Sequence, residues 1–364
     1  MRRAVAAVVG VTVLLIGVFA WRHVGGDGGP APAGPDARAG PAVSAGAAAD
    51  GSPVGGGARA GVETAVPGAA PAAPLPPLDV PLRLVVDELR QRAEAGDAGA
   101  ACRLAAEFER CRALGAQVHT VGPGAFILEA LLREADEAGH ADQVQPHIEE
   151  QDRAWQAASR DFEHCAGVPE PSPAEEVRYW RRAALGGHVP AMRHYALGNA
   201  FRPGALLALA PELEAYRKEA GHLAVRAAAA GDLAMIHALA HAYLPDPAAD
   251  WVPRGSRPFL DQVVVADASK ALEWLYVLQG HPDARRVSEG HPIRDLPARY
   301  LPELEVRLPP DAVVAASGAA TGRVRGWRPG QSGPVRTERY GGGRLADVAR
   351  DECEPGANAW RTGP

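Results

Sequence analysis

Apolar residues in the central part of the chain recur at helical spacing after a glycine. The eighth, ninth and twelfth residues after Gly96 are Leu, Ala and Phe, and the same offsets after Gly231 hold Leu, Ala and Tyr. Positions three or four apart lie on one face of a helix, so each set forms an apolar stripe. The fourth residue after the glycine is small at Ala100 and Ala191, which lets two helices pack closely. The pattern predicts a helix after each of these glycines.

The glycines divide the chain at nearly regular intervals. A glycine followed by Asp or His occurs at Gly96, Gly139, Gly187, Gly231 and Gly280, with spacings of 43, 48, 44 and 49 residues. The apolar stripe is poor after the second and fifth of them, and the Gly-His pairs at 221–222 and 290–291 fall outside the period. Glycine readily adopts the left-handed conformation that ends a helix, and an Asp after it can cap the next helix. The period predicts stacked two-helix units, because one such unit cannot bury its apolar face alone.

Three stretches of the chain carry short motifs that belong together as parts of one repeat pattern. They are Ala-Ala-Leu-Gly-Gly-His-Val-Pro-Ala at 183–191, Ala-Gly-Asp-Leu-Ala at 230–234, and Lys270-Ala271 with Trp274 ahead of a repeat glycine. In these motifs the chain resembles the Sel-1-like repeats, which belong to the tetratricopeptide-like superfamily. The resemblance implies an all-α fold, a right-handed α/α solenoid of helix-turn-helix repeats, that binds proteins or cell-envelope components. It implies no catalytic residues and no cofactor. The periods are longer than is usual in the family, which implies insertions such as the stretch 245–265.

The N-terminus begins with a methionine and two arginines, followed by a long apolar run. Residues 4–21 carry no charge and are rich in Val, Leu and Ile, so they are long enough to span a bilayer with the arginines on the cytoplasmic side. A cleaved signal peptide ending at Ala20 is the alternative, although the run is longer than a signal-peptide core. The composition is typical of a GC-rich bacterium. We therefore predict a signal anchor over residues 1–21 in a bacterial inner membrane, single-pass, with the bulk of the chain in the periplasm.

Composition divides the rest of the chain into three parts. Residues 22–81 are dominated by Pro, Ala and Gly and cannot bury enough apolar area to fold, so we predict a disordered linker. Residues 82–306 hold 33 acidic and 24 basic residues, a net charge of −9, which suits one helical-repeat domain and disfavours nucleic-acid binding. Residues 307–364 are rich in Arg and Gly, and we predict that they form a disordered tail.

All four cysteines lie after the predicted membrane segment, where an oxidising compartment permits disulfides. Cys102 and Cys111 are nine residues apart, about half a turn out of phase on one helix, so they cannot bridge each other. We predict a disulfide between Cys111 and Cys165, with Cys102 to Cys165 as the alternative. Cys353 in the tail would then be free or would form an intermolecular bond.

One pair of histidines has the spacing of a metal site. His237 and His241 are four residues apart and therefore on one face of a helix, and Asp232 or Asp246 could supply a third ligand. Ala238 stands where a zinc hydrolase of this pattern carries its glutamate base, so hydrolytic chemistry is unsupported. The simpler interpretation is that both histidines fill polar gaps between packed helices. Other catalytic signatures, such as Gly-x-Ser-x-Gly or a phosphate-binding glycine loop, are absent from the sequence.

The sequence therefore predicts a membrane-anchored periplasmic helical-repeat scaffold that mediates protein–protein interaction at the cell envelope, and no enzyme. The expected partners are unidentified envelope proteins and, through residues 4–21, the inner membrane, but no nucleic acid. We place the contact surface on the concave face of the repeats, with Arg193, His194, Arg226 and His237 as exposed candidates. The alternative function is a periplasmic enzyme or metal-binding module that uses His237 and His241.

Overall fold

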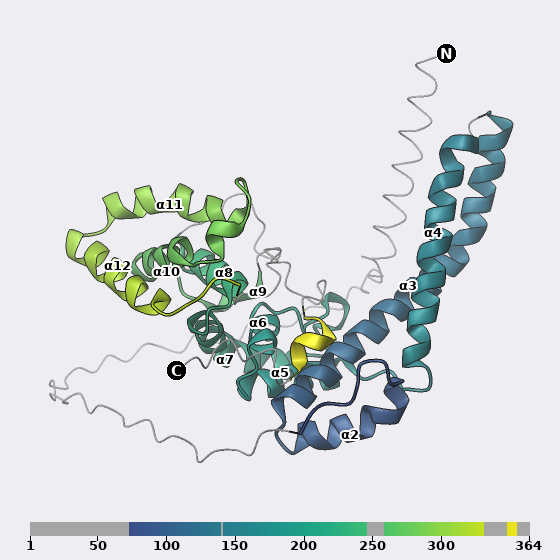
Figure 1. Cartoon of the computed structure of the whole chain (residues 1–364), viewed down its shortest axis with the longest axis horizontal. Helices are drawn as coiled ribbons and strands as arrows, with labels where there is room; N and C mark the ends of the chain where they lie inside the picture. Colours follow the sequence, from purple (N-terminus) through teal and green to yellow (C-terminus); the bar gives the residue numbers. More distant parts are fainter. Residues whose placement is uncertain (1–72, 140, 246–257, 331–347, 355–364) are drawn as a thin grey trace, which may run out of the picture. The chain divides into compact units, whose positions relative to one another are not determined.

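The computed structural model describes residues 73–139, 141–245, 258–330 and 348–354, all within the unit Val66–Pro364. The regular structure in these ranges is helical and contains no strand, which confirms the predicted all-α fold (Figure 1). The α-helices are α2 (Leu82–Glu94), α3 (Ala98–Glu137), α4 (Ala141–Phe162), α5 (Pro173–Leu185), α6 (Val189–Ala196), α7 (Ala210–Ala229), α8 (Leu233–Tyr243), α9 (Phe259–Val263), α10 (Ala268–Gly280), α11 (Pro292–Arg307) and α12 (Pro310–Val324). Short 3-10 turns include η1 (Glu163–Cys165), η4 (Ala284–Arg286) and η5 (Arg350–Cys353).

Three turns join helices into pairs by the predicted chemistry. Gly96, Gly187 and Gly231 lie between α2 and α3, α5 and α6, and α7 and α8, with φ angles of +97°, +89° and +88°. Only glycine adopts this left-handed conformation without a steric cost. The side chain that follows each glycine, Asp or His, accepts a hydrogen bond from the backbone N–H three residues further on and so caps the second helix. The predicted turn is confirmed at these three positions.

The turn at Gly139 is also found where it was predicted, but the one at Gly280 is only partly as predicted. Gly139, with φ of +75°, ends α3, and the chain then returns as α4 along α3. The second half of α3 and helix α4 thus form a hairpin that is inserted between the pair α2–α3 and the pair α5–α6 and is not a repeat. Gly280 is the last residue of α10, and the next long helix, α11, begins only after Gly290 (φ +78°), where His291 accepts a hydrogen bond from the N–H of Ile293. Gly280 therefore ends a helix as predicted, but the prediction that the next repeat helix begins directly after it was wrong. That helix begins after the following Gly-His pair, Gly290-His291.

The helix pairs pack on one another in chain order around one apolar core. Helix α3 packs against α5, α6 against α7, and α8 against α10. These contacts are close because the facing residues are small. Ala183, Ala184 and Ala191 are fully buried, and a Cβ added at Gly186 would lie 2.7 Å from the Cβ of Ala98. This order of packing is compatible with an α/α solenoid.

Part of the predicted disordered tail is folded, which corrects that prediction. Helix α12 packs on α10 and buries Ala316 and Ala320, which lie four residues apart on one face. The Arg- and Gly-rich composition around this segment concealed its short apolar stripe. A second piece, residues 348–354, packs on α3 and is bonded to it through Cys353. The remainder of the tail lies outside the described residues.

The last residues of the predicted linker are also packed against the domain, and α2 begins at the predicted domain boundary. Leu75 is buried, and Arg92 donates a hydrogen bond of 2.8 Å to the carbonyl oxygen of Pro74. Residues 22–72 and the predicted membrane segment 4–21 lie outside the described residues. Within the part of the chain that the structure describes, no helix combines the length and the apolar character needed to cross a membrane.

Two disulfides hold the domain together. Cys111 is bonded to Cys165, with 5.6 Å between the Cα atoms, which confirms the predicted bridge and rules out the pairing of Cys102 with Cys165. Cys102 is bonded instead to Cys353, with 5.5 Å between the Cα atoms. The prediction that Cys353 is free or intermolecular was therefore wrong, because it treated the whole tail as detached from the domain.

Candidate protein-interaction surfaces

Most of the residues predicted to form an exposed contact surface are buried. Arg193 and His194 lie in α6 and His237 lies in α8, and these residues are 7%, 0% and 4% exposed. All eight residues of α6 are buried, because neighbouring helices and the C-terminal segment surround it. Only Arg226, in α7, is exposed as predicted. The prediction was wrong for the other three residues because a polar side chain was assumed to face solvent.

Arg193 joins two helix pairs and the C-terminal segment. Its guanidinium donates a hydrogen bond of 2.8 Å to Asp232, the residue that caps α8, and lies 3.5 Å from the carboxylate of Glu352. A buried arginine needs such partners, since leaving its charge unpaired would cost several kcal/mol. The charge of Arg193 is therefore used inside the domain.

The two histidines with metal-site spacing do not form a metal centre with the described residues around them. Asp232 is occupied by Arg193 and by the cap of α8, and Asp246 lies outside the described residues. His241 faces Asp261 instead, with 3.4 Å between Nδ1 and Oδ2. Among the described residues, one group of three potential ligand atoms lies close together, those of Cys102, His188 and Cys353. Its two sulfur atoms are bonded to each other, so neither is available to a metal.

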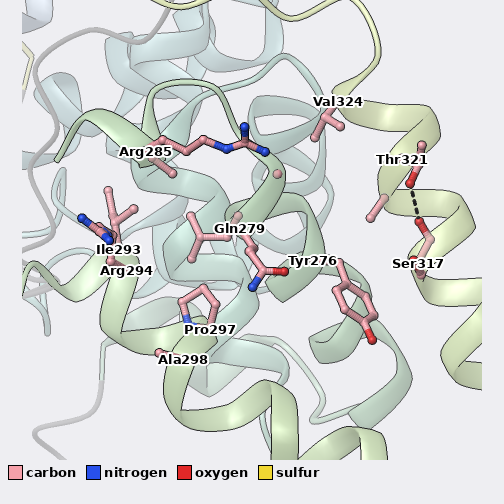
Figure 2. Close-up of a pocket in the computed structure, with 14 residues that line it drawn as sticks. Tyr276, Gln279, Arg285, Ile293, Arg294, Pro297, Ala298, Ser317, Thr321 and Val324 are labelled. Carbon is pink, nitrogen blue, oxygen red and sulfur yellow. Dashed lines mark hydrogen bonds between the residues drawn. The ribbon is translucent and has the colours of Figure 1, made fainter. Parts of the chain in front are cut away.

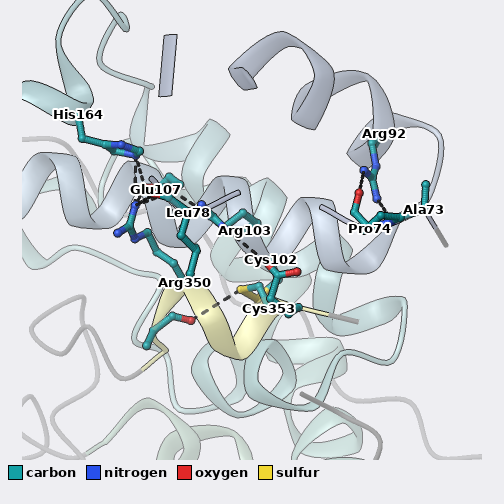
Figure 3. Close-up of polar contacts among 12 residues, drawn as sticks. Ala73, Pro74, Leu78, Arg92, Cys102, Arg103, Glu107, His164, Arg350 and Cys353 are labelled. Carbon is teal, nitrogen blue, oxygen red and sulfur yellow. Dashed lines mark hydrogen bonds and ion pairs between the residues drawn. A yellow bond between two sulfur atoms is a disulfide. The ribbon is translucent and has the colours of Figure 1, made fainter. Parts of the chain in front are cut away.

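A row of buried charged side chains lies along α3 beside the Cys102–Cys353 bridge (Figure 3). Arg103 and Glu107 are 2% and 1% exposed, and 2.8 Å separates the Arg103 Nε from a Glu107 carboxylate oxygen. Arg350 and His164 also reach this carboxylate, at 3.0 Å and 3.1 Å. Burial lowers the pKa of His164, and the negative charge of Glu107 opposes this effect. In the sequence, Arg103 and Glu107 lie four residues apart within an apolar stripe, which could have indicated a buried ion pair. The sequence analysis missed this signal.

Two further buried carboxylates are also matched by arginines. Glu176 on α5 is 1% exposed and is paired with Arg112 at 3.2 Å and with Arg202. Arg112 also lies 3.7 Å from Glu109. Carboxylates that serve as a general acid or base are usually reachable from a cleft, whereas Glu176 and Glu109 are buried and lie beside guanidinium groups. This arrangement indicates a structural network and no catalytic pair.

His281 provides a pH-dependent contact between helix pairs. Its Nδ1 accepts a hydrogen bond from the N–H of Asp283, so its Nε2 carries the proton of the neutral ring and donates to the carbonyl oxygen of Gly231 at 3.2 Å. Burial lowers the pKa of His281 below its ordinary value of 6.5, with smaller opposing effects from the Gly231 hydrogen bond and the charges of Asp283 and Asp232. The contact is therefore built around the neutral imidazole.

We expect the domain to lose stability as the pH falls below 6.5, because the unfolded state takes up the proton on His281 before the folded state does. The stability that neutral His281 contributes is complete above its ordinary pKa of 6.5 and is lost as the pH falls from there to the lowered pKa of the folded state. The loss is about 1.4 kcal/mol for each unit by which the pKa is lowered. Urea unfolding at pH 7.5, 6.5 and 5.5 measures how the free energy of unfolding changes with pH. His281→Gln should reduce this dependence on pH. The control is His222→Gln, which removes an imidazole from an exposed position of α7 and should leave the dependence unchanged. Equal slopes in the two variants would contradict the assignment.

A cleft of about 570 Å³ lies between α11 and α12, with α10 as its floor (Figure 2). Both α11 and α12 pack on α10, and the cleft between α11 and α12 is open to solvent. Ile293 and Pro297 line the α11 side, and Ser317 and Thr321 line the α12 side. The α12 side also includes Ala320 and Val324, so both sides of the cleft combine apolar and polar side chains.

The charged side chains that line the cleft are both arginines. Arg285 is exposed and makes no hydrogen bond or ion pair within the described part of the chain, and Arg294 has its nearest acidic partner, Glu289, 3.8 Å away. Tyr276 donates a hydrogen bond of 2.7 Å to Glu305, which together with burial raises its pKa to about 12. In a domain of net negative charge, this cleft is a local positive region that suits carboxylate and carbonyl groups.

No protein-family model, no curated protein and no solved structure matches this chain. Sequence reasoning did not find the cleft, because its residues come from three helices and the η4 turn, and one of these helices, α12, lies in the predicted tail.

Proposed function

We propose that this protein is a helical-repeat scaffold of the Sel-1-like kind that binds a segment of a partner protein in the cleft between α11 and α12. In this proposal residues 4–21 anchor it in a bacterial inner membrane and the repeats lie in the periplasm. The two disulfides support an oxidising compartment. The observation that carries the proposal is the cleft itself, open and lined by two arginines as its charged residues.

The dimensions of the cleft support a peptide ligand. Ligand sites in proteins typically have volumes of about 300–1,000 Å³ and combine apolar walls with a few polar groups that fix orientation. An extended peptide presents backbone carbonyls and carboxylates, which Arg285 and Arg294 can bind through hydrogen bonds and charge. The floor is helix α10, whose buried face includes Leu275 and Leu278, so the binding surface is formed before the ligand arrives.

Charge reversal in the cleft should abolish partner capture without unfolding the domain. In cells that express the tagged full-length protein, crosslinking followed by mass spectrometry should recover envelope proteins with the natural chain and lose them with Arg285→Glu combined with Arg294→Glu. We expect a loss of at least about tenfold, because charged hydrogen bonds contribute about 1.5–3 kcal/mol each. The matched control is Arg226→Glu, which reverses an exposed arginine on α7, outside the cleft.

The control separates the cleft from the surface first predicted around Arg226. Retained capture in the double cleft variant together with loss in Arg226→Glu would reject the cleft. Circular dichroism of both variants checks that the helices remain folded. Membrane and soluble fractions of the same cells test the anchor: recovery of the full-length protein only in the soluble fraction would reject it.

A further inference from the structure

Residues 348–354, which we call the strap, return from the C-terminal part of the chain and lie on α3 (Figure 3). Their η5 turn places Cys353 in its bridge to Cys102, and Val348 and Cys353 are buried. The backbone comes close to α3 at a glycine: a Cβ added at Gly99 would lie 3.1 Å from the carbonyl oxygen of Cys353. The strap thus fits the surface of the helix stack in shape.

Every second residue of the strap from Arg350 to Glu354 is charged and lies near a residue of opposite charge on the surface. Arg350 lies 3.0 Å from Glu107, and Glu354 lies 3.2 Å from Arg103. Between them, Glu352 lies 3.5 Å from Arg193. Each of the three contacts pairs opposite charges. The charges that face the surface thus follow the order Arg-x-Glu-x-Glu along the strap.

The charges on the surface side are held in place by contacts that do not involve the strap. Arg103 is bonded to Glu107, Glu107 also contacts His164, and Arg193 is bonded to Asp232. Their positions are fixed by α3 and α6, whose apolar residues form part of the core. A preorganised set of charges of this kind is typical of a binding surface, since little side-chain freedom is lost when the ligand docks.

We propose that the surface formed by Gly99, Cys102, Arg103, Glu107 and Arg193 binds a partner segment of the form Arg-x-Glu-x-Glu, and that the strap occupies this surface in cis. This surface is separate from the cleft between α11 and α12. The strap is held by its bond to Cys102 and by its tether, which gives it a high effective concentration. Release requires a dithiol: it reduces the bridge to two thiols, at Cys102 and Cys353, and is itself oxidised to a disulfide.

The test uses the full chain with Cys353→Ser, Arg350→Ala, Glu352→Ala and Glu354→Ala, so that the strap of this variant no longer carries the cysteine and the charges that hold it on the surface. Cys111 and Cys165 are bonded to each other, so Cys102 is the one free thiol of this variant. A synthetic peptide with the natural sequence of residues 348–354 carries thionitrobenzoate on its cysteine as a mixed disulfide. When the Cys102 thiolate attacks the peptide sulfur, a disulfide forms between Cys102 and the peptide, and thionitrobenzoate leaves and is followed by its absorbance. The control peptide carries Glu352→Arg and Glu354→Arg.

We expect the natural peptide to react about tenfold faster than the control peptide and to saturate with concentration, because two charged contacts precede the chemical step. General attraction to the acidic domain predicts the opposite order, since the control peptide is the more positive one. Equal rates would show that Cys102 reacts without recognition, and the absence of any Cys102–peptide adduct in the mass spectrum would show that the strap cannot be replaced. Either result overturns the proposal, and neither depends on the cleft.

Discussion

Gly198→Ala should lower the free energy of unfolding by about 3 kcal/mol, whereas Gly290→Ala should lower it by about 1 kcal/mol. The two glycines have nearly the same backbone conformation, with φ angles of +79° and +78°, so an alanine pays the same left-handed cost at both. The difference lies in their surroundings. A Cβ at Gly198 would lie 2.6 Å from the Cβ of Phe259, while no heavy atom lies within 4 Å of a Cβ at Gly290.

Guanidinium unfolding of the two purified variants and the natural protein measures this difference. Phe259 lies on the short helix α9 and contacts the rings of Phe201 and Tyr216, with centroids 5.9 Å and 6.0 Å away. An alanine at Gly198 would push α9 away from this aromatic cluster. If both variants lost the same amount of stability, α9 would not be packed against Gly198 as the structure has it.

Arg193→Met should destabilise the domain by about 3–5 kcal/mol. Methionine fills much of the volume of the arginine, but it leaves the carboxylate of Asp232, which is 5% exposed, buried without its guanidinium partner. The second change Asp232→Asn should restore a large part of the loss, because asparagine keeps an oxygen that can cap α8 and carries no charge. The free energies of unfolding of the single and double variants form a double-mutant cycle that isolates the ion pair.

Lys218→Met is the matched control for this cycle. Lys218 and Glu214 form an ion pair at 3.0 Å on α7, and both side chains are largely exposed. Solvent screens such a pair, so we expect no measurable change in stability. A loss in Arg193→Met as small as in this control, with no recovery in the double variant, would mean that Arg193 is not the partner of Asp232.

The sequence was sufficient where the determining interactions are local. The turns at Gly96, Gly187 and Gly231 depend on one left-handed residue and one capping side chain, and both can be recognised within a few positions. For the disulfides, helical phase excluded a bond between Cys102 and Cys111 but left Cys111 and Cys102 as alternative partners of Cys165, and the structure decides for Cys111. At the three turns a short stretch of residues already contains the physical cause.

The sequence was insufficient where a partner lies far away along the chain. Arg193 is buried because it meets Asp232, 39 residues away, and Glu352, 159 residues away. No local pattern reveals that these charges are matched, so an arginine was predicted to face solvent. The cleft was missed for a related reason, since α12 buries only two alanines and no large apolar side chain, so its sequence alone gives little sign that it packs on the domain.

The Cys111–Cys165 bridge also decides how far local opening can spread. It closes the chain into a loop of which α4 and most of α3 are part, and within α4 only Ala158 is buried among the described side chains. In the hairpin that it forms with α3, helix α4 thus contributes few buried side chains, and we expect it to separate from α3 at a lower free energy than the repeat core unfolds. Because the covalent bond lies where the hairpin leaves the core, separation of α3 from α4 stops at the sulfur atoms. The hairpin and the repeats are therefore expected to behave as two cooperative units within one folded chain.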